Sequence, residues 1–270
     1  MVIDSHVHCV KNAGEHGFGD AFRRLSQSMK SSRIDLCVAI PDNRSGTDTA
    51  DLDTLLGIAE IHPEIVVVGS PYVFKYSTHE VDRLSALAGA RRIRGVKLFP
   101  GHDNFYPTDR RCSVFYELCV KHRLPLIIHT GENPGDPGSC RYNDPKHIAK
   151  VARRYPGLTV VISHYFWPRM EYCYDLTKDV ANIAYDTSGM ADAEVVEKSG
   201  GIGRVRDILQ KTLLRKPDGV MLGSDWPGCS QEEHLELIAS LDVASDIKER
   251  VLFTNAFRMF GIDVDCPPSC

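Results

Sequence analysis

Two histidines near the start of the chain, His6 and His8, stand two residues apart at the end of a short apolar run. In a strand, residues two apart point to the same face, so both imidazoles can reach one metal ion. His129 and Asp225 each end a later apolar run and can add a third nitrogen ligand and an oxygen ligand. Three or four such ligands with one open position describe a catalytic site for zinc or a similar divalent ion.

His164 ends a further apolar run and is a candidate for acting on the substrate. A bound divalent ion would lower the pKa of water to about 7 and make hydroxide available at neutral pH. Asp225 would then bind the metal and accept the proton of the water, while His164 would stabilise a developing oxyanion or polarise the substrate. A single strand histidine is more often a satisfied core group than a ligand, but this combination at the ends of different strands predicts a metal site.

Lys97 lies inside an apolar run, where a lysine is rarely buried without a partner. One interpretation is an ion pair with Asp4 or Asp225 in the protein interior. The other is a carboxylated lysine that bridges two metal ions. The sequence leaves both open, so we expect one metal ion, or two if Lys97 is carboxylated.

The segments that must position these residues alternate along the chain. Short β-branched runs are followed repeatedly by longer stretches with apolar residues at helical spacing, as in residues 51–59. This alternation is typical of βαβ units around a parallel sheet. The short runs begin near Val2, Asp35, Ile65, Ile93, Pro125, Leu158, Asn182 and Gly219.

Eight such units in 270 residues predict an α/β fold with a closed (β/α)8 barrel, formed by residues 1–270 as a single domain. A doubly wound open sheet is the alternative, but no GxGxxG follows the first strand, and polar residues end several strands rather than one switch point. The C-terminal strand ends of a barrel form the rim that holds the active site. We also expect an active-site loop at 132–143 and an extra C-terminal helix at 245–260 that ends at Gly261.

The composition narrows the class of partner. A net charge of -4 gives no indication of a nucleic-acid partner, so we expect a small-molecule substrate. No apolar run approaches the roughly 20 residues of a membrane span, and no signal peptide is evident at the N-terminus. The nine cysteines show no CxxC spacing and suit a reduced, cytoplasmic protein. Homo-oligomerisation stays open.

Taken together, these motifs resemble the amidohydrolase superfamily. The similarity extends along the whole chain and is closest to the amidohydrolase-related branch, which includes aminocarboxymuconate-semialdehyde and resorcylate-type decarboxylases. The segments that carry it are Asp4-Ser5-His6-Val7-His8, Gly95-Val96-Lys97-Leu98-Phe99-Pro100, His129-Thr130-Gly131, Ser163-His164, Tyr185-Asp186-Thr187-Ser188 and Gly223-Ser224-Asp225-Trp226-Pro227.

The resemblance implies a TIM barrel, distorted as in metal-dependent hydrolases. It implies that one divalent ion, usually zinc, is bound by four residues of this chain: His6, His8, His129 and Asp225. It also implies that His164 acts on the substrate or on the bound water. Lys97 matches the carboxylated lysine of two-metal members such as dihydroorotases, whereas the amidohydrolase-related branch usually works with one metal.

Two features of the chain suggest how specificity is set. Where relatives often carry glycines after the strand-six histidine, this chain has the bulky segment 165–169, Tyr-Phe-Trp-Pro-Arg, which we expect to narrow the pocket. Basic residues in the predicted rim loops would suit a substrate that bears a carboxylate, or are solvated surface charges. These residues are Arg44, Lys75, Arg141 and Arg169.

Two enzymatic activities fit this site. The first is hydrolysis of an amide, lactone or related bond by activated water. The second is non-oxidative decarboxylation of an unsaturated or aromatic acid on the same metal. A binding protein on a degenerate barrel is a third reading, which the complete ligand set argues against.

Replacement of Asp225 tests the predicted site. Asp225→Asn is expected to abolish turnover while leaving the fold largely intact, because catalytic rim residues are not part of the barrel core. Turnover and the circular dichroism spectrum would be compared with those of the unaltered protein. Near-normal turnover in the variant would show that the catalytic assignment is wrong.

Overall fold

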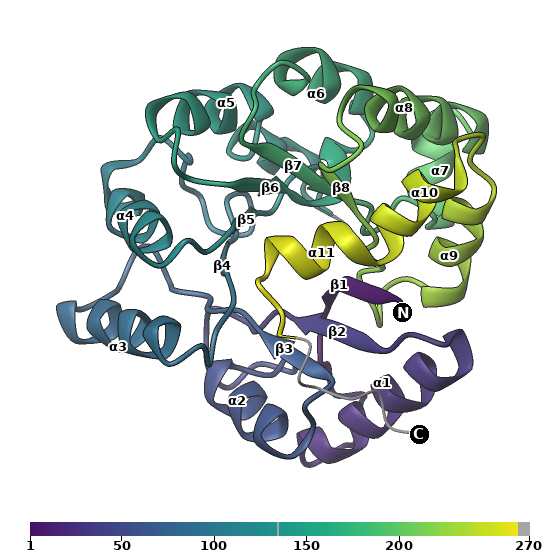
Figure 1. The fold of residues 1–270 in the computed structure, drawn as a ribbon. Coiled ribbons are helices and arrows are strands. Elements are labelled where there is room, and N and C mark those ends of the chain that lie inside the picture. Colours follow the sequence, from purple (N-terminus) through teal and green to yellow (C-terminus); the bar gives the residue numbers. More distant parts are fainter. Residues whose placement is uncertain (134, 264–270) are drawn as a thin grey trace.

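Eight strands alternate with helices in residues 1–133 and 135–263, which the computed structural model describes (Figure 1). Each strand begins at or shortly after its predicted start. The strands are β1 (Ile3–Val7), β2 (Leu36–Ala39), β3 (Ile65–Val67), β4 (Val96–Leu98), β5 (Leu126–Ile128), β6 (Val160–Ile162), β7 (Ile183–Asp186) and β8 (Val220–Met221).

All neighbouring strands pair in parallel, in the orders β1-β2-β3 and β4-β5-β6-β7-β8. Backbone hydrogen bonds join these two ladders at both ends. Lys97 N donates to Gly69 O at 2.7 Å between β4 and the end of β3, and Ser5 N donates to Leu222 O at 2.8 Å between β1 and the end of β8. The strands therefore form one ring, and the predicted (β/α)8 barrel is confirmed.

Helices surround this ring (Figure 1). They are α1 (Phe18–Ser32), α2 (Leu52–Ile61), α3 (Thr78–Gly89), α4 (Ser113–His122), α5 (Pro145–Arg154), α6 (Met170–Thr177), α7 (Ala193–Lys198), α8 (Ile202–Arg215) and α9 (Gln231–Ala239). Acidic caps set several helix starts, because a carboxylate can accept from the unpaired backbone amides of the first turn. Asp51 accepts from Thr54 N at 3.0 Å, and Asp144 accepts from Lys146 N at 2.9 Å. Among the described residues, no helix is long and apolar enough to cross a membrane.

The predicted C-terminal helix is present as three consecutive segments. These are α10 (Ser245–Glu249), a π-helical turn (Arg250–Thr254) and α11 (Asn255–Met259). Ala256 and Phe260 belong to the apolar cluster inside the barrel, together with Ile3 and Leu36 from the first residues of β1 and β2. Helix α11 therefore covers the N-terminal end of the barrel and leaves the opposite end for a site.

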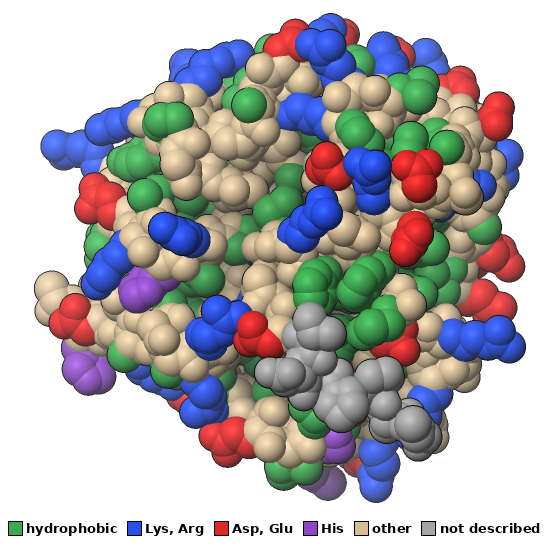
Figure 2. Space-filling view, in the orientation of Figure 1, with side chains coloured by type: hydrophobic (Ala, Val, Ile, Leu, Met, Phe, Trp, Pro, Cys, Tyr) green, Lys and Arg blue, Asp and Glu red, His purple; other side chains and the backbone are tan. Residues whose placement is uncertain are grey.

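Figures 1 and 2 view the molecule from this covered end. Hydrophobic side chains gather over and beside α11, while charged side chains surround them toward the edge (Figure 2). Partly buried apolar residues of this region, such as Phe253 and Phe257, pack against the cluster inside the barrel. The C-terminal helix thus extends the core of the barrel at this end.

Phe260 is a test of this packing, because its side chain is only 3% exposed. Phe260→Ala is expected to lower the free energy of unfolding by about 3–5 kcal/mol, through lost burial and the cavity that remains. Urea denaturation measures the change. The control is Leu214→Ala, at a position that is 74% exposed, where a change within about 0.5 kcal/mol is expected. Equal stabilities of the two variants would contradict the role of α11.

Candidate metal centre and active site

A cavity of about 510 Å³ opens at the C-terminal ends of the strands. It brings together all six residues that the sequence nominated for metal binding or catalysis, including Lys97. The lining residues are His6, His8, Val10, Asp42, Asn43, Thr49, Lys97, Phe99, His102, His129, His164, Asp225, Pro227 and Gly228.

Asp225 lies at the centre of this group. Its Oδ1 is 3.4 Å from Nε2 of both His6 and His8, and its Oδ2 is 4.0 Å from Nδ1 of His164. Its backbone is held in the left-handed region, with φ 73°, by a hydrogen bond of 2.9 Å from its N–H to the carbonyl of His6. Burial raises the pKa of Asp225, but the neighbouring His164, His8 and His6 outweigh it and hold the pKa well below its usual range. The carboxylate is therefore ionised.

His6 is oriented by a buried carboxylate that sequence analysis did not select. Its Nδ1 lies 2.9 Å from Oδ2 of Asp186, at the end of β7. Nδ1–H must donate, because an ionised carboxylate can only accept, and Nε2 therefore carries the lone pair. This Nε2 is buried and has no hydrogen-bond partner within residues 1–133 and 135–263. Burial, followed by the charge of Lys97, lowers the pKa of His6 to about 3, so the ring is neutral.

Two further imidazoles are fixed in the same way. Nδ1 of His8 donates to the carbonyl of Ile40 at 3.0 Å, which leaves Nε2 to face Asp225. Nε2 of His129 lies 2.9 Å from Oδ1 of Asn133, which leaves Nδ1 as the available ring nitrogen. Fixing one nitrogen with an acceptor sets the tautomer and direction of the other, as in known metal-binding histidines.

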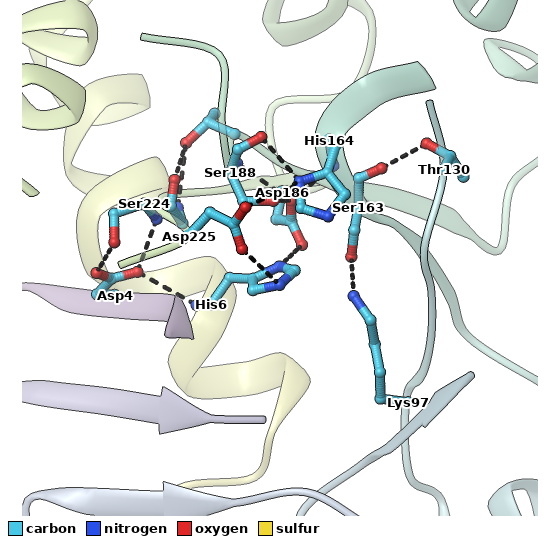
Figure 3. A network of polar contacts seen from close by, with 12 residues as sticks. Asp4, His6, Lys97, Thr130, Ser163, His164, Asp186, Ser188, Ser224 and Asp225 are labelled. Carbon is cyan, nitrogen blue, oxygen red and sulfur yellow. Dashed lines mark hydrogen bonds and ion pairs between the residues drawn. The ribbon is translucent and has the colours of Figure 1, made fainter. Parts of the chain in front are cut away.

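His164 sits on a left-handed turn that follows β6, with φ 60°. Its Nδ1 lies 2.9 Å from Oγ and 3.2 Å from the carbonyl of Ser188, and its backbone N–H donates to Oδ1 of Asp186 at 3.1 Å (Figure 3). Asp186 thus contacts both His6 and the turn that carries His164. Burial raises the pKa of Asp186, but His6, His164 and Lys97 outweigh it and lower the pKa.

The donor set fits a divalent metal ion. Ligand atoms of His6, His164 and Asp225 lie within 4.8 Å of one another, and imidazole nitrogen with carboxylate oxygen is a set that suits zinc. The unpartnered, buried Nε2 of His6 supports this fit, because a buried polar atom is seldom left without a partner. The sequence predicts that His164 acts on the substrate, yet His164 belongs to this group of three residues. The predicted ligands His8 and His129 do not belong to it.

Lys97 extends into the same cavity from β4 and is fully buried. Its Nζ donates to Oγ of Ser163 at 3.0 Å. Neither Asp4 nor Asp225 lies within ion-pairing distance of it in the described part of the chain, so the first of the two interpretations of Lys97, the ion pair, is wrong. Burial lowers the pKa of Lys97 to about 8, although Asp186 and Asp225 favour its charged form.

Asp4 is unavailable to Lys97 because its carboxylate is bonded to Ser224, which follows β8, and to Gln231 at the start of α9. It accepts from Ser224 N at 2.9 Å and from Ser224 Oγ at 2.6 Å (Figure 3). It also accepts from Gln231 Nε2 at 2.9 Å. Burial raises the pKa of Asp4 to about 6 against these hydrogen bonds. Asp4 therefore fixes the residue before Asp225 relative to β1, and it does not face the cavity.

None of the predicted basic rim residues lines the cavity; these are Arg44, Lys75, Arg141 and Arg169. Arg44 is paired with the buried carboxylate of Asp103, and Arg169 lies over the ring of Phe166, 4.7 Å from its centre. The cationic side chain in the cavity is instead that of Lys97.

The bulky segment 165–169 does not narrow the cavity either. Tyr165 and Phe166 share the left-handed backbone of His164, with φ of 52° and 59°, which turns their side chains into the packed layer outside the barrel. The hydroxyl of Tyr165 bonds to Thr212 on α8, and its ring stacks on Tyr185 at 4.6 Å. The expectation failed because the strand pattern gives no sign of three consecutive left-handed residues.

His102 is a lining residue that sequence reasoning missed. It follows β4 in a turn that contains Gly101, with φ 99°, and Asp103 N donates to Phe99 O at 2.9 Å. Its ring centre is 4.3 Å from that of His129. His102 lies in a loop rather than at a strand end. The signal in the sequence that could have indicated it is its position shortly after β4.

Asp186→Asn tests the orienting role of Asp186. An amide keeps one acceptor oxygen, which cannot serve His6 and the His164 turn together, so affinity for zinc is expected to fall by about 10- to 100-fold. Competition with a chromogenic chelator measures this affinity. Asp179→Asn is the matched control, because Asp179 forms an exposed ion pair with Arg215. Unchanged affinity in Asp186→Asn would contradict the role of Asp186.

Comparison with known proteins places this site in a family. No curated protein matches the chain. Among solved structures, an uncharacterised TIM-barrel protein from Bordetella bronchiseptica is 22% identical, with a TM-score of 0.76 over 96% of this chain and 98% of that one. A 5-carboxyvanillate decarboxylase from Sphingomonas paucimobilis and a probable 2-pyrone-4,6-dicarboxylic acid hydrolase from Acinetobacter baumannii are each 16% identical, with TM-scores of 0.68 over 97% of this chain and 99% of theirs.

These structures have the same barrel fold. The family model described as amidohydrolase matches residues 43–262, which is most of the sequence. Members of this family are enzymes and are typically metal-dependent. The chain belongs to the amidohydrolase family.

Proposed function

We propose that this protein is a metal-dependent hydrolase that uses activated water to open an amide, lactone or related bond of a small substrate bearing a carboxylate. The observation that carries the proposal is the position of Asp225. Its Oδ1 is 3.4 Å from Nε2 of two imidazoles, those of His6 and His8, inside a cavity open to small molecules. An ionised carboxylate there is suited to bind a cation and to accept a proton.

The residues that would hold the metal are His6, His8, His129 and Asp225, with zinc as the expected ion. When bound, the ion would act as a Lewis acid and lower the pKa of water to about 7. His164 lies close to His6 and Asp225, so its ring also borders the metal position. The contacts of Ser188 support a role for His164 on the substrate rather than as a metal ligand, because the carbonyl and hydroxyl of Ser188 lie against Nδ1.

Asp225 and His164 would carry out the proton transfer. The depressed pKa of Asp225 keeps it unprotonated at neutral pH, so it can take the proton of the attacking water. Burial lowers the pKa of His164 and keeps its ring neutral. With Nδ1–H donated to the carbonyl of Ser188, Nε2 remains free to receive this proton in turn from Asp225. The imidazolium formed in this way would stabilise an oxyanion or protonate the leaving group.

Decarboxylation of an unsaturated or aromatic acid is the second candidate. It is supported by the solved decarboxylase that shares the barrel fold, and by the aromatic ring of Phe99 beside the ammonium of Lys97 in the cavity. The same metal ligands would serve both reactions, so the two candidates differ in the bond that breaks.

We also propose a cytoplasmic location. All seven cysteines in the described ranges are free thiols, and most of them are buried. Free thiols in this number suit a reducing compartment. The proposed substrate is a small molecule.

Assaying lactones, amides and carboxylated aromatics side by side separates the candidates. Turnover is expected to disappear after chelation and to return when zinc is added, with acid released from a lactone and no CO2. Release of CO2 from an aromatic acid would instead favour decarboxylation. Undiminished activity in a protein shown by elemental analysis to hold no metal would refute both.

A further inference from the structure

Strand β4 presents two chemically different side chains to the cavity. Lys97 and Phe99 stand two residues apart and therefore point to the same face of the strand, and both line the cavity. Lys97 Nζ lies 5.3 Å from the centre of the Phe99 ring. A charged donor thus stands beside the face of an aromatic ring, at the inner end of the space that a substrate would enter.

Among the residues that the structure describes, Lys97 has no carboxylate partner, although it is fully buried. Its described hydrogen bond goes to the neutral hydroxyl of Ser163, and an ammonium has three protons to donate. The nearest carboxylates have other partners: Asp186 is bonded to His6, and Asp225 lies against His6 and His8. Since a buried charge is costly unless it is paired, an anion from outside the protein would complete the environment of Lys97.

The wall beyond Phe99 is fixed in place. The ring of His102 lies edge-on to Phe99, with centres 5.8 Å apart. The next residue, Asp103, is buried and accepts hydrogen bonds from Asn43 and Arg44 of the loop after β2. The turn that carries His102 is therefore tied to a second rim loop, and the surface around Phe99 is preorganised for a flat group.

We propose that Lys97 and Phe99 form the subsite for the acid group of the substrate, with the carboxylate on the ammonium of Lys97 and an unsaturated or aromatic skeleton packed against Phe99 and His102. This proposal rests on the proposed function, because it takes the cavity as the substrate site. Lys97 then acts as an uncarboxylated ammonium group that selects an anionic substrate.

Calorimetric titration with benzoate and benzamide tests this subsite, because the two probes share a ring and differ in charge. The zinc-loaded protein is compared with Lys97→Met and with Arg169→Met, which removes a cation outside the cavity. Lys97→Met is expected to weaken benzoate binding by about 10- to 100-fold and to leave benzamide binding unchanged. Arg169→Met is expected to change neither, and Phe99→Leu is expected to weaken both probes.

Equal benzoate affinity in Lys97→Met and the unaltered protein would overturn the proposal. If Lys97→Met does not fold, a crystal structure of the unaltered zinc protein with benzoate decides: a carboxylate within about 3 Å of Lys97 Nζ supports the subsite, and one placed elsewhere overturns it. A carbamate signal from Lys97 in ¹³C-bicarbonate NMR would also overturn it. Binding of benzoate through Lys97 without turnover of any acid, lactone or amide would refute the proposed function and leave this subsite standing.

Discussion

The site depends on the contact between the first and last strands of the barrel. His8 N donates to Trp226 O at 2.7 Å, and Asp225 N donates to His6 O at 2.9 Å. Gly223 makes this approach possible, because a Cβ there would lie 3.0 Å from Cβ of His6. These bonds place the paired histidines beside Asp225, so the geometry of the proposed metal ligands is set by closure of the ring rather than by any local motif.

A second layer of hydrogen bonds gives the imidazoles their direction. Each of the four strand-end histidines has one ring nitrogen beside a fixed oxygen, which comes from Asp186, Ile40, Asn133 or Ser188. Two of these oxygens are backbone carbonyls and two belong to side chains. Because a backbone carbonyl moves only with the barrel, the orientation of two of the four imidazoles is set by the backbone fold itself.

The strand-end chemistry was predictable because apolar runs end in polar residues at His6, His129, His164 and Asp225, and parallel strands deliver such residues to one rim. Site residues that lie in loops between the apolar runs were harder to predict. His102 belongs to a turn whose direction depends on a tie to another loop, and the side chains after His164 depend on left-handed backbone that the strand pattern cannot reveal.

Charge was the least predictable property, because ion pairing depends on neighbours far apart in the sequence. Lys97 lies within ion-pairing reach of neither predicted acid, and Asp4 accepts its hydrogen bonds from Ser224 and Gln231. Arg44, expected to be free at the rim, is held by Asp103, which is 59 residues away. The sequence showed how many charges there are, but only the fold shows which of them a substrate would meet.

The pairing of Arg44 with Asp103 also bears on how a substrate reaches the cavity. The lining on this side includes the acidic Asp42 and the neutral Asn43 and Thr49, and the charge of Arg44 is paired with that of Asp103. Long-range electrostatic steering can raise association rates by about 10- to 1,000-fold, and it is lost as ionic strength increases. Because its charge is paired, Arg44 would add little steering of this kind, and discrimination between charged and neutral molecules would arise after entry, at Lys97 inside the cavity.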